Sequence, residues 1–159
     1  MCRTTSLMLL TLLTVPVVGA CGGESDAEVA AAEEAVRAAA QADSVMLADS
    51  MFDPAAFDTI TWESQAVALE RGSLVWGISC SKCHGRTGAG DAGFVQRGDT
   101  LRPPSFLAED WRFADDEEGL KRQVFTGTAE GMPHWGFYGL KYRDIDAVAL
   151  YIRERMRGM

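Results

Sequence analysis

The stretch GISCSKCHG, residues 77–85, places three chemically versatile side chains within five positions. Cys80 and Cys83 are three residues apart, and His84 directly follows the second cysteine. Two thiols at this spacing can form a disulfide, bind a metal ion or exchange disulfides with another protein. None of these chemistries requires an imidazole at the next position. The pattern therefore calls for a chemistry that uses all three side chains.

The alternatives differ in what else they demand of the chain. A structural zinc site normally takes four protein ligands, and the adjacent Cys83 and His84 cannot easily both face one small ion. A thioredoxin-like pair needs a strand–helix–strand setting, which the pattern lacks. A plain structural disulfide stays open as a minor alternative. Cys-x-x-Cys-His is the attachment signature of c-type haem, in which each sulfur binds one vinyl group and the histidine reaches the iron.

A second axial ligand would have to come from a distant part of the chain. The segment GTAEGMPHWG, residues 127–136, holds Met132 between a glycine and a proline, and therefore in a defined loop. The other methionines lie near the termini, in the N-terminal segments or on a C-terminal helical stripe. Methionine and histidine together raise the potential of a haem and suit electron transfer. His134, two residues later, is the competing candidate.

Three segments after residue 63 have the apolar spacing of helices that bury one face. They cover residues 64–80, 115–127 and 144–156. Acids fill the first turn of the second segment, where the helix dipole favours negative charge, and Gly127 is its expected C-cap. The inner faces comprise Leu69, Gly72, Trp76 and Cys80 in the first segment, Leu120 and Val124 in the second, and Ile145, Val148, Ala149, Ile152 and Met156 in the third.

The remaining pattern predicts an all-α domain. No run of alternating apolar and polar residues indicates a strand, and glycines and prolines mark long loops between the helices. About 97 residues with three or four helices make a thin core. We therefore expect one covalently bound haem to complete the centre, with the loops wrapped around it.

The N-terminus has the features of an export signal. Arg3 precedes an apolar run from Leu7 to Val18, which is shorter than the roughly 20 residues that a spanning helix needs. The run ends in VGAC, residues 18–21, which resembles the lipobox of bacterial lipoproteins. The resemblance implies cleavage after residue 20 and lipidation of Cys21. An ordinary signal peptide is the alternative.

The charge is concentrated in the segment that follows. The chain has a net charge of -8, and residues 22–62 alone carry nine acids and one base. This segment is rich in alanine but has only a thin apolar stripe, which favours an exposed, partly helical tether over a docking helix. The predicted organisation is a signal peptide at 1–20, a lipidated cysteine with its tether at 21–62, and a domain at 63–159. No basic patch indicates nucleic acid binding.

Residues 64–157 resemble a class I cytochrome c. The resemblance implies that Gly72 packs against Tyr151 of the last helix, and that RPPSF supplies the carbonyl that accepts a hydrogen bond from the proximal His84, from either Pro103 or Pro104. It also places the distal ligand directly before a proline, which favours Met132 over His134. One departure is Lys141, where the family often has a capping serine or threonine, a loss of about 1 kcal/mol.

The functional expectation is an electron carrier rather than an enzyme. With His84 and Met132 on the iron, a small-molecule substrate finds no open coordination position. We expect an exported protein, lipid-anchored on the periplasmic side of a membrane, that exchanges electrons with membrane redox complexes or other cytochromes. A haem c subunit fixed within a larger respiratory complex is the main alternative. A gas or peroxide sensor, in which Met132 dissociates, is the other.

Overall fold

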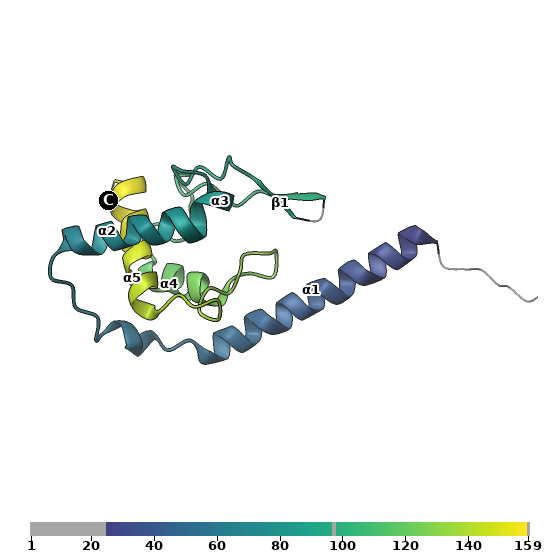
Figure 1. The fold of residues 1–159 in the computed structure, drawn as a ribbon, viewed down its shortest axis with the longest axis horizontal. Coiled ribbons are helices and arrows are strands. Elements are labelled where there is room, and N and C mark those ends of the chain that lie inside the picture. The colour runs from purple at the N-terminus through teal and green to yellow at the C-terminus, as the bar shows by residue number, and fades with distance from the viewer. Residues whose placement is uncertain (1–24, 97, 159) are drawn as a thin grey trace, which may run out of the picture.

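The computed structural model describes residues 25–96 and 98–158, so the predicted signal peptide and Cys21 lie outside the described residues. The fold is mostly helical with long connecting loops (Figure 1), which confirms the all-α prediction. Among the described residues, no helix is both long enough and apolar enough to cross a bilayer. The elements are, in order, α1 (Asp26–Met51), η1 (Pro54–Phe57), α2 (Gln65–Val75), η2 (Trp76–Cys80), α3 (Ser81–His84), β1 (Phe94–Gln96), β2 (Asp99–Leu101), α4 (Glu117–Thr126), α5 (Tyr142–Tyr151) and η3 (Ile152–Met156).

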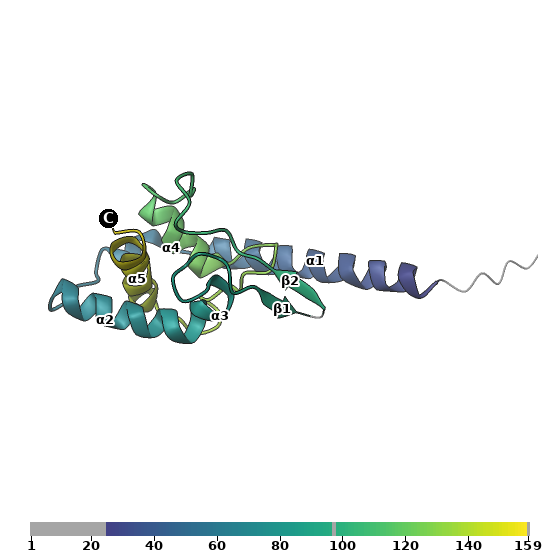
Figure 2. The ribbon, with the colours of Figure 1, turned by 90° about the horizontal axis from the view of Figure 1, so that it is seen from above.

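The centre of the domain is the crossing of α2 and α5, which both ribbon views show (Figures 1 and 2). Gly72 makes this crossing possible, because a β-carbon there would lie 2.6 Å from Tyr151 Cβ and closer still to the Ala147 carbonyl oxygen. The predicted contact between Gly72 and Tyr151 is therefore confirmed. The backbone of α5, through Ala147, lies closer still to Gly72 than Tyr151 does.

The predicted inner faces of the helices form one core. Ile145, Val148 and Ala149 of α5 are completely buried, and Leu120 and Val124 of α4 are 4% exposed. Gly127 ends α4 with a φ of 72° and an N–H that donates to Gln123, as expected of a C-cap. At the start of α5, the Asp144 carboxylate accepts from the Lys141 N–H at 3.1 Å. Asp144 thus satisfies the N–H of the residue that precedes the helix, whereas Lys141 offers no side-chain acceptor to the first turn.

A small antiparallel hairpin was not predicted. β1 and β2 pair with Val95 opposite Thr100, and Gly98 in the turn has a φ of 93°. Each strand has only three residues, too few for an alternating pattern to stand out. The expectation that no strand is present was therefore wrong for this segment.

The acidic N-terminal segment forms one continuous helix, α1, of 26 residues. It begins with a capping box, in which the Ser25 side chain accepts from the Glu28 N–H and the Glu28 carboxylate accepts from the Ser25 N–H. Its N-terminal part projects away from the domain in both ribbon views (Figures 1 and 2). Its C-terminal part packs against α4, where Ala48 is completely buried.

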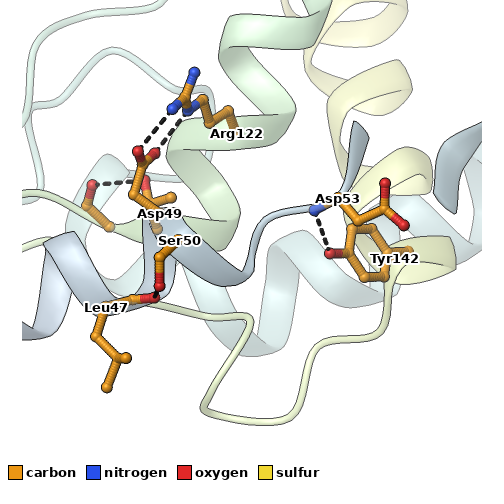
Figure 3. A network of polar contacts seen from close by, with 8 residues as sticks. Leu47, Asp49, Ser50, Asp53, Arg122 and Tyr142 are labelled. Carbon is orange, nitrogen blue, oxygen red and sulfur yellow. Dashed lines mark hydrogen bonds and ion pairs between the residues drawn. The ribbon is translucent and has the colours of Figure 1, made fainter. Parts of the chain in front are cut away.

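Specific polar contacts hold this end of α1 on the domain (Figure 3). Arg122 of α4 makes two hydrogen bonds of 2.7 Å to the Asp49 carboxylate. The Asp53 N–H donates to the Tyr142 hydroxyl at 2.9 Å, and the Trp62 indole N–H donates to Asp146 at 2.7 Å. Contacts with the packed domain therefore begin well before residue 63.

Candidate functional site

The two cysteines lie where the first long helix changes its winding. Cys80 ends the π-helical turn η2, and Cys83 lies in the short helix α3 that follows. A π-turn shifts the register of the residues after it, and such turns are common at functional sites. Both side chains are free thiols, with Cys80 buried and Cys83 partly exposed. Burial raises the pKa of Cys80 to about 12 and also raises that of Cys83, so both thiols are protonated at neutral pH.

His84 is the last residue of α3 and points into an aromatic environment. Its ring centroid is 4.7 Å from that of Phe106 and 5.9 Å from that of Trp76. Burial lowers the pKa of His84 to about 4, so the imidazole is neutral at neutral pH and retains a lone pair for a metal. Its Nδ1 atom is buried and has no hydrogen-bond partner among the described residues.

The loop with the two prolines folds against the turn that follows His84. The Gly90 N–H donates to the His84 carbonyl at 3.0 Å, and the Phe106 N–H donates to the Gly88 carbonyl at 2.8 Å. The Pro103 carbonyl lies directly against Gly90, where a β-carbon would collide with it. The loop is thus close to His84, but no bond from Nδ1 to Pro103 or Pro104 is formed in this structure. That role stays a prediction for the haem-loaded protein.

Phe106 contacts the candidate site, although no pattern in the sequence singled it out. Its ring contacts the His84 ring, and its ring centroid lies 5.7 Å from that of Trp76 and 5.2 Å from that of Trp111. Its backbone carbonyl accepts a hydrogen bond from Arg157. The only signal in the sequence was its position two residues after Pro104. A large aromatic residue at the wall of the site shields His84 from solvent.

Met132 lies in a loop closed by its own backbone. The Thr128 N–H donates to the Met132 carbonyl at 3.0 Å, and the Met132 N–H donates to the Thr128 hydroxyl at 3.3 Å. The Met132 sulfur lies 4.0 Å from the side-chain nitrogen of Gln123. In Figure 1, α3 lies on the upper side of the domain, whereas α4 and the loop after it lie on the lower side.

His134, the competing candidate, is stacked within its own loop. Its ring lies 4.9 Å from the Tyr138 ring at an interplanar angle of 21°, and 5.5 Å from the Phe137 ring. Its Nδ1 atom is buried without a partner among the described residues. The aromatic stacking occupies the face of His134, whereas the Met132 side chain packs against the hydrophobic core.

The donor set fits a covalently bound haem better than a simple metal ion. In residues 25–96 and 98–158, no three His, Cys, Asp or Glu side chains are grouped so that they could hold a metal ion. Two free thiols instead directly precede a neutral histidine in the chain. The buried Nδ1 atom of this histidine has no hydrogen-bond partner among the described residues, and neither has the indole nitrogen of Trp76. The wall around them is apolar and aromatic. A thiol adds across a vinyl group by forming the S–C bond and giving its hydrogen to the other vinyl carbon.

A small helical domain with this motif defines a c-type cytochrome. The family model described as cytochrome c oxidase, cbb3-type, subunit III matches residues 67–152, which is more than half of the chain. The chain belongs to this family, and its cofactor is a covalently bound haem c. No solved structure matches the chain significantly. The match begins within α2, so α1 and the segment to residue 66 lie outside it.

Proposed function

We propose that this protein is an electron-transfer protein with a single haem c, bound through Cys80 and Cys83 and ligated by His84 and Met132. The observation that carries the proposal is the pair of free thiols beside a buried, neutral histidine whose Nδ1 has no partner. The chain has one Cys-x-x-Cys-His motif, which accounts for one haem. The haem iron would supply the one-electron chemistry.

The protein residues would hold the haem and keep water away from it. His84 would bind the iron from the end of α3, and its neutral imidazole would need no deprotonation. Trp76 and Phe106, both less than 10% exposed, wall the histidine side of the site. A methionine ligand and an apolar surround both favour a high potential. With His84 and Met132 both bound to the iron, electron transfer would require little rearrangement.

The proposal includes a lipid anchor at Cys21 on the periplasmic side of a bacterial membrane. Support comes from the apolar N-terminal run and the VGAC sequence that ends it. The electron partners would be membrane redox complexes or other cytochromes, reached while the anchor keeps the domain near the surface. A helix of 26 residues, such as α1, spans about 39 Å.

A second candidate is a haem c subunit that stays bound within an oxidase complex. The family description, which names an oxidase subunit, favours this candidate. Both candidates share the same haem chemistry and differ in whether the protein stays bound to its redox partner. Native gels of gently solubilised membranes separate them, since a fixed subunit migrates with the complex and a free carrier migrates alone.

The test of the shared chemistry is an optical spectrum of the exported protein with a redox titration. We expect one haem c per chain, a single one-electron transition and no binding of carbon monoxide to the ferrous protein at moderate concentration. A double Cys80→Ser/Cys83→Ser variant should lack covalent haem, whereas Ser81→Ala, between the two cysteines, should retain it. Rapid carbon monoxide binding would favour the sensor alternative and contradict stable methionine ligation.

A further inference from the structure

Helix α1 contacts the loop that carries the candidate distal ligand. The side-chain nitrogen of Gln41 donates to the Thr128 carbonyl at 3.0 Å and lies 3.5 Å from the Met132 carbonyl. Gln41 is separated from these residues by 87 and 91 positions in the chain. One amide group from the N-terminal helix therefore bridges the two ends of the Thr128–Met132 turn.

The two carbonyls that Gln41 contacts lie at the two ends of this turn, where its backbone closes on itself. The Met132 carbonyl also accepts from the Thr128 N–H, and the Thr128 carbonyl also accepts from the Gly131 N–H at 3.2 Å. Each carbonyl oxygen has two lone pairs, so Gln41 uses the remaining acceptor capacity at both ends of the turn. Opening the turn would leave these partly buried carbonyls without one of their donors.

Gln41 is itself held in place by contacts that do not involve the loop. The two hydrogen bonds between Arg122 and Asp49 fix α1 on α4 two helical turns further along. Ala48, on the same side of the helix, is completely buried. The helix therefore provides a fixed support from which Gln41 can restrain the loop.

We propose that Gln41 is a positioning residue for Met132. By holding the Thr128 and Met132 carbonyls together, Gln41 keeps Met132 available as the distal ligand. The inference rests on the proposed function, because it requires Met132 to be the ligand. Helix α1 lies outside the matched family region. The inference gives this helix a role in the haem site, in addition to separating the domain from the membrane. Removal of one ordinary hydrogen bond corresponds to roughly a two- to tenfold shift in the equilibrium between open and closed loop.

The test compares four variants of the haem-loaded protein with the wild-type protein. Gln41→Ala removes the donor without weakening the helix, because alanine is the best helix former. Gln41→Glu keeps the shape but turns the donor into an acceptor facing two carbonyls. Gln41→Lys restores a donor and is the rescue variant. Ser44→Ala is the matched control, since Ser44 lies on α1 and bonds only to the carbonyl of Ala40 within the helix.

Two measurements are made on each form: hydrogen exchange at the Thr128 and Met132 amides, and the ferric absorption band from sulfur-to-iron charge transfer. We expect roughly two- to tenfold faster exchange and a weaker band in Gln41→Ala, a larger effect in Gln41→Glu, and near wild-type values in Gln41→Lys and Ser44→Ala. Unchanged exchange in Gln41→Ala, faster exchange with an unchanged band, an equal effect of Ser44→Ala or failure of the lysine rescue would each overturn the positioning role. Absence of the band from the wild-type protein would instead overturn methionine ligation itself.

Discussion

Gly72 of α2 lies directly against the backbone of α5, with no room for a β-carbon between it and the Ala147 carbonyl. The two helices that frame the haem domain therefore approach as closely as their main chains allow. Any side chain at residue 72 must push α2 away from α5. Since α2 continues through η2, which ends at Cys80, this displacement would also move Cys80.

We expect Gly72→Ala to lower the free energy of unfolding by about 1–3 kcal/mol, the usual cost of overpacking a tight core. The measurement is denaturant unfolding of the haem-loaded protein. Gly77→Ala is the matched control, because Gly77 lies in the same helical run and a β-carbon there would have nothing within 4 Å. The control should be neutral or slightly stabilising. Equal destabilisation by both substitutions would contradict the close-packing explanation.

Much of the fold could be predicted from helical spacing alone. Ile145, Val148 and Ile152 recur at intervals of three and four, and all three are buried in the structure. Gly127 was expected to end α4, and it does. Such features depend on residues close together in the chain, so local pattern is sufficient to reveal them.

The features that the sequence did not reveal depend on contacts between distant segments. Phe106 packs on His84 only because the loop after β2 folds back over α3. Gln41 meets the Met132 loop across more than 80 residues, and no periodicity records such a contact. The docked end of α1 includes an ion pair between Asp49 and Arg122, two exposed charged residues that resemble ordinary surface positions. The thin apolar stripe of α1 gave no indication of this docking.

The identity of the distal ligand is tested by paired substitutions in the Met132 loop. We expect Met132→Ala to abolish the ferric sulfur-to-iron charge-transfer band and to lower the redox potential, because methionine ligation favours the ferrous state. His134→Ala should retain both properties, because the proposed ligand is Met132 and not His134. Optical spectra and redox titrations of the two variants provide the measurement. The reverse result would identify His134 as the ligand.

The docking of α1 should depend on pH. The hydrogen bond from Arg122 holds the pKa of the Asp49 carboxyl below its ordinary value of 3.8. A carboxyl with a lower pKa in the docked state stabilises docking above its undocked pKa, and this contribution is lost as the pH falls through the docked pKa. We therefore expect α1 to loosen from α4 below pH 3.8. Distances between spin labels on exposed positions of α1 and α5 would report the change.

Two variants separate this ion pair from general acid effects. Asp49→Asn should loosen the docking of α1 already at neutral pH, and the docking should then no longer change with pH below 3.8. Glu34→Gln should leave both the docking and its dependence on pH unchanged, because Glu34 pairs with Arg37 within α1. The effect should be modest, since Asp49 and Arg122 are both exposed and salt screens such pairs. Identical pH profiles for Asp49→Asn and the wild-type protein would show that other contacts control the docking.

The proposed lipid anchor at Cys21 should attach the protein to the membrane without affecting its haem. If Cys21 carries acyl chains, they contribute about 0.8 kcal/mol per buried methylene, and more than one chain gives stable attachment. The C-terminal part of α1 is docked on α4, so we expect the helix and the domain to move together. A Cys21→Ser variant, exported by another signal, should be soluble with an unchanged spectrum and potential.

Electron delivery from the Cys21→Ser protein to membrane partners should nevertheless fall, because attachment to the same surface supplies a high effective concentration that the released protein lacks. A control is Cys2→Ser in the chain with its own signal, which changes the other N-terminal cysteine and should leave the protein on the membrane. Fractionation of cells and the rate of electron delivery to washed membranes are the two measurements. Membrane retention of Cys21→Ser would contradict the anchor. Undiminished delivery by the released protein would show that binding to the partner, rather than tethering, sets the rate of electron transfer.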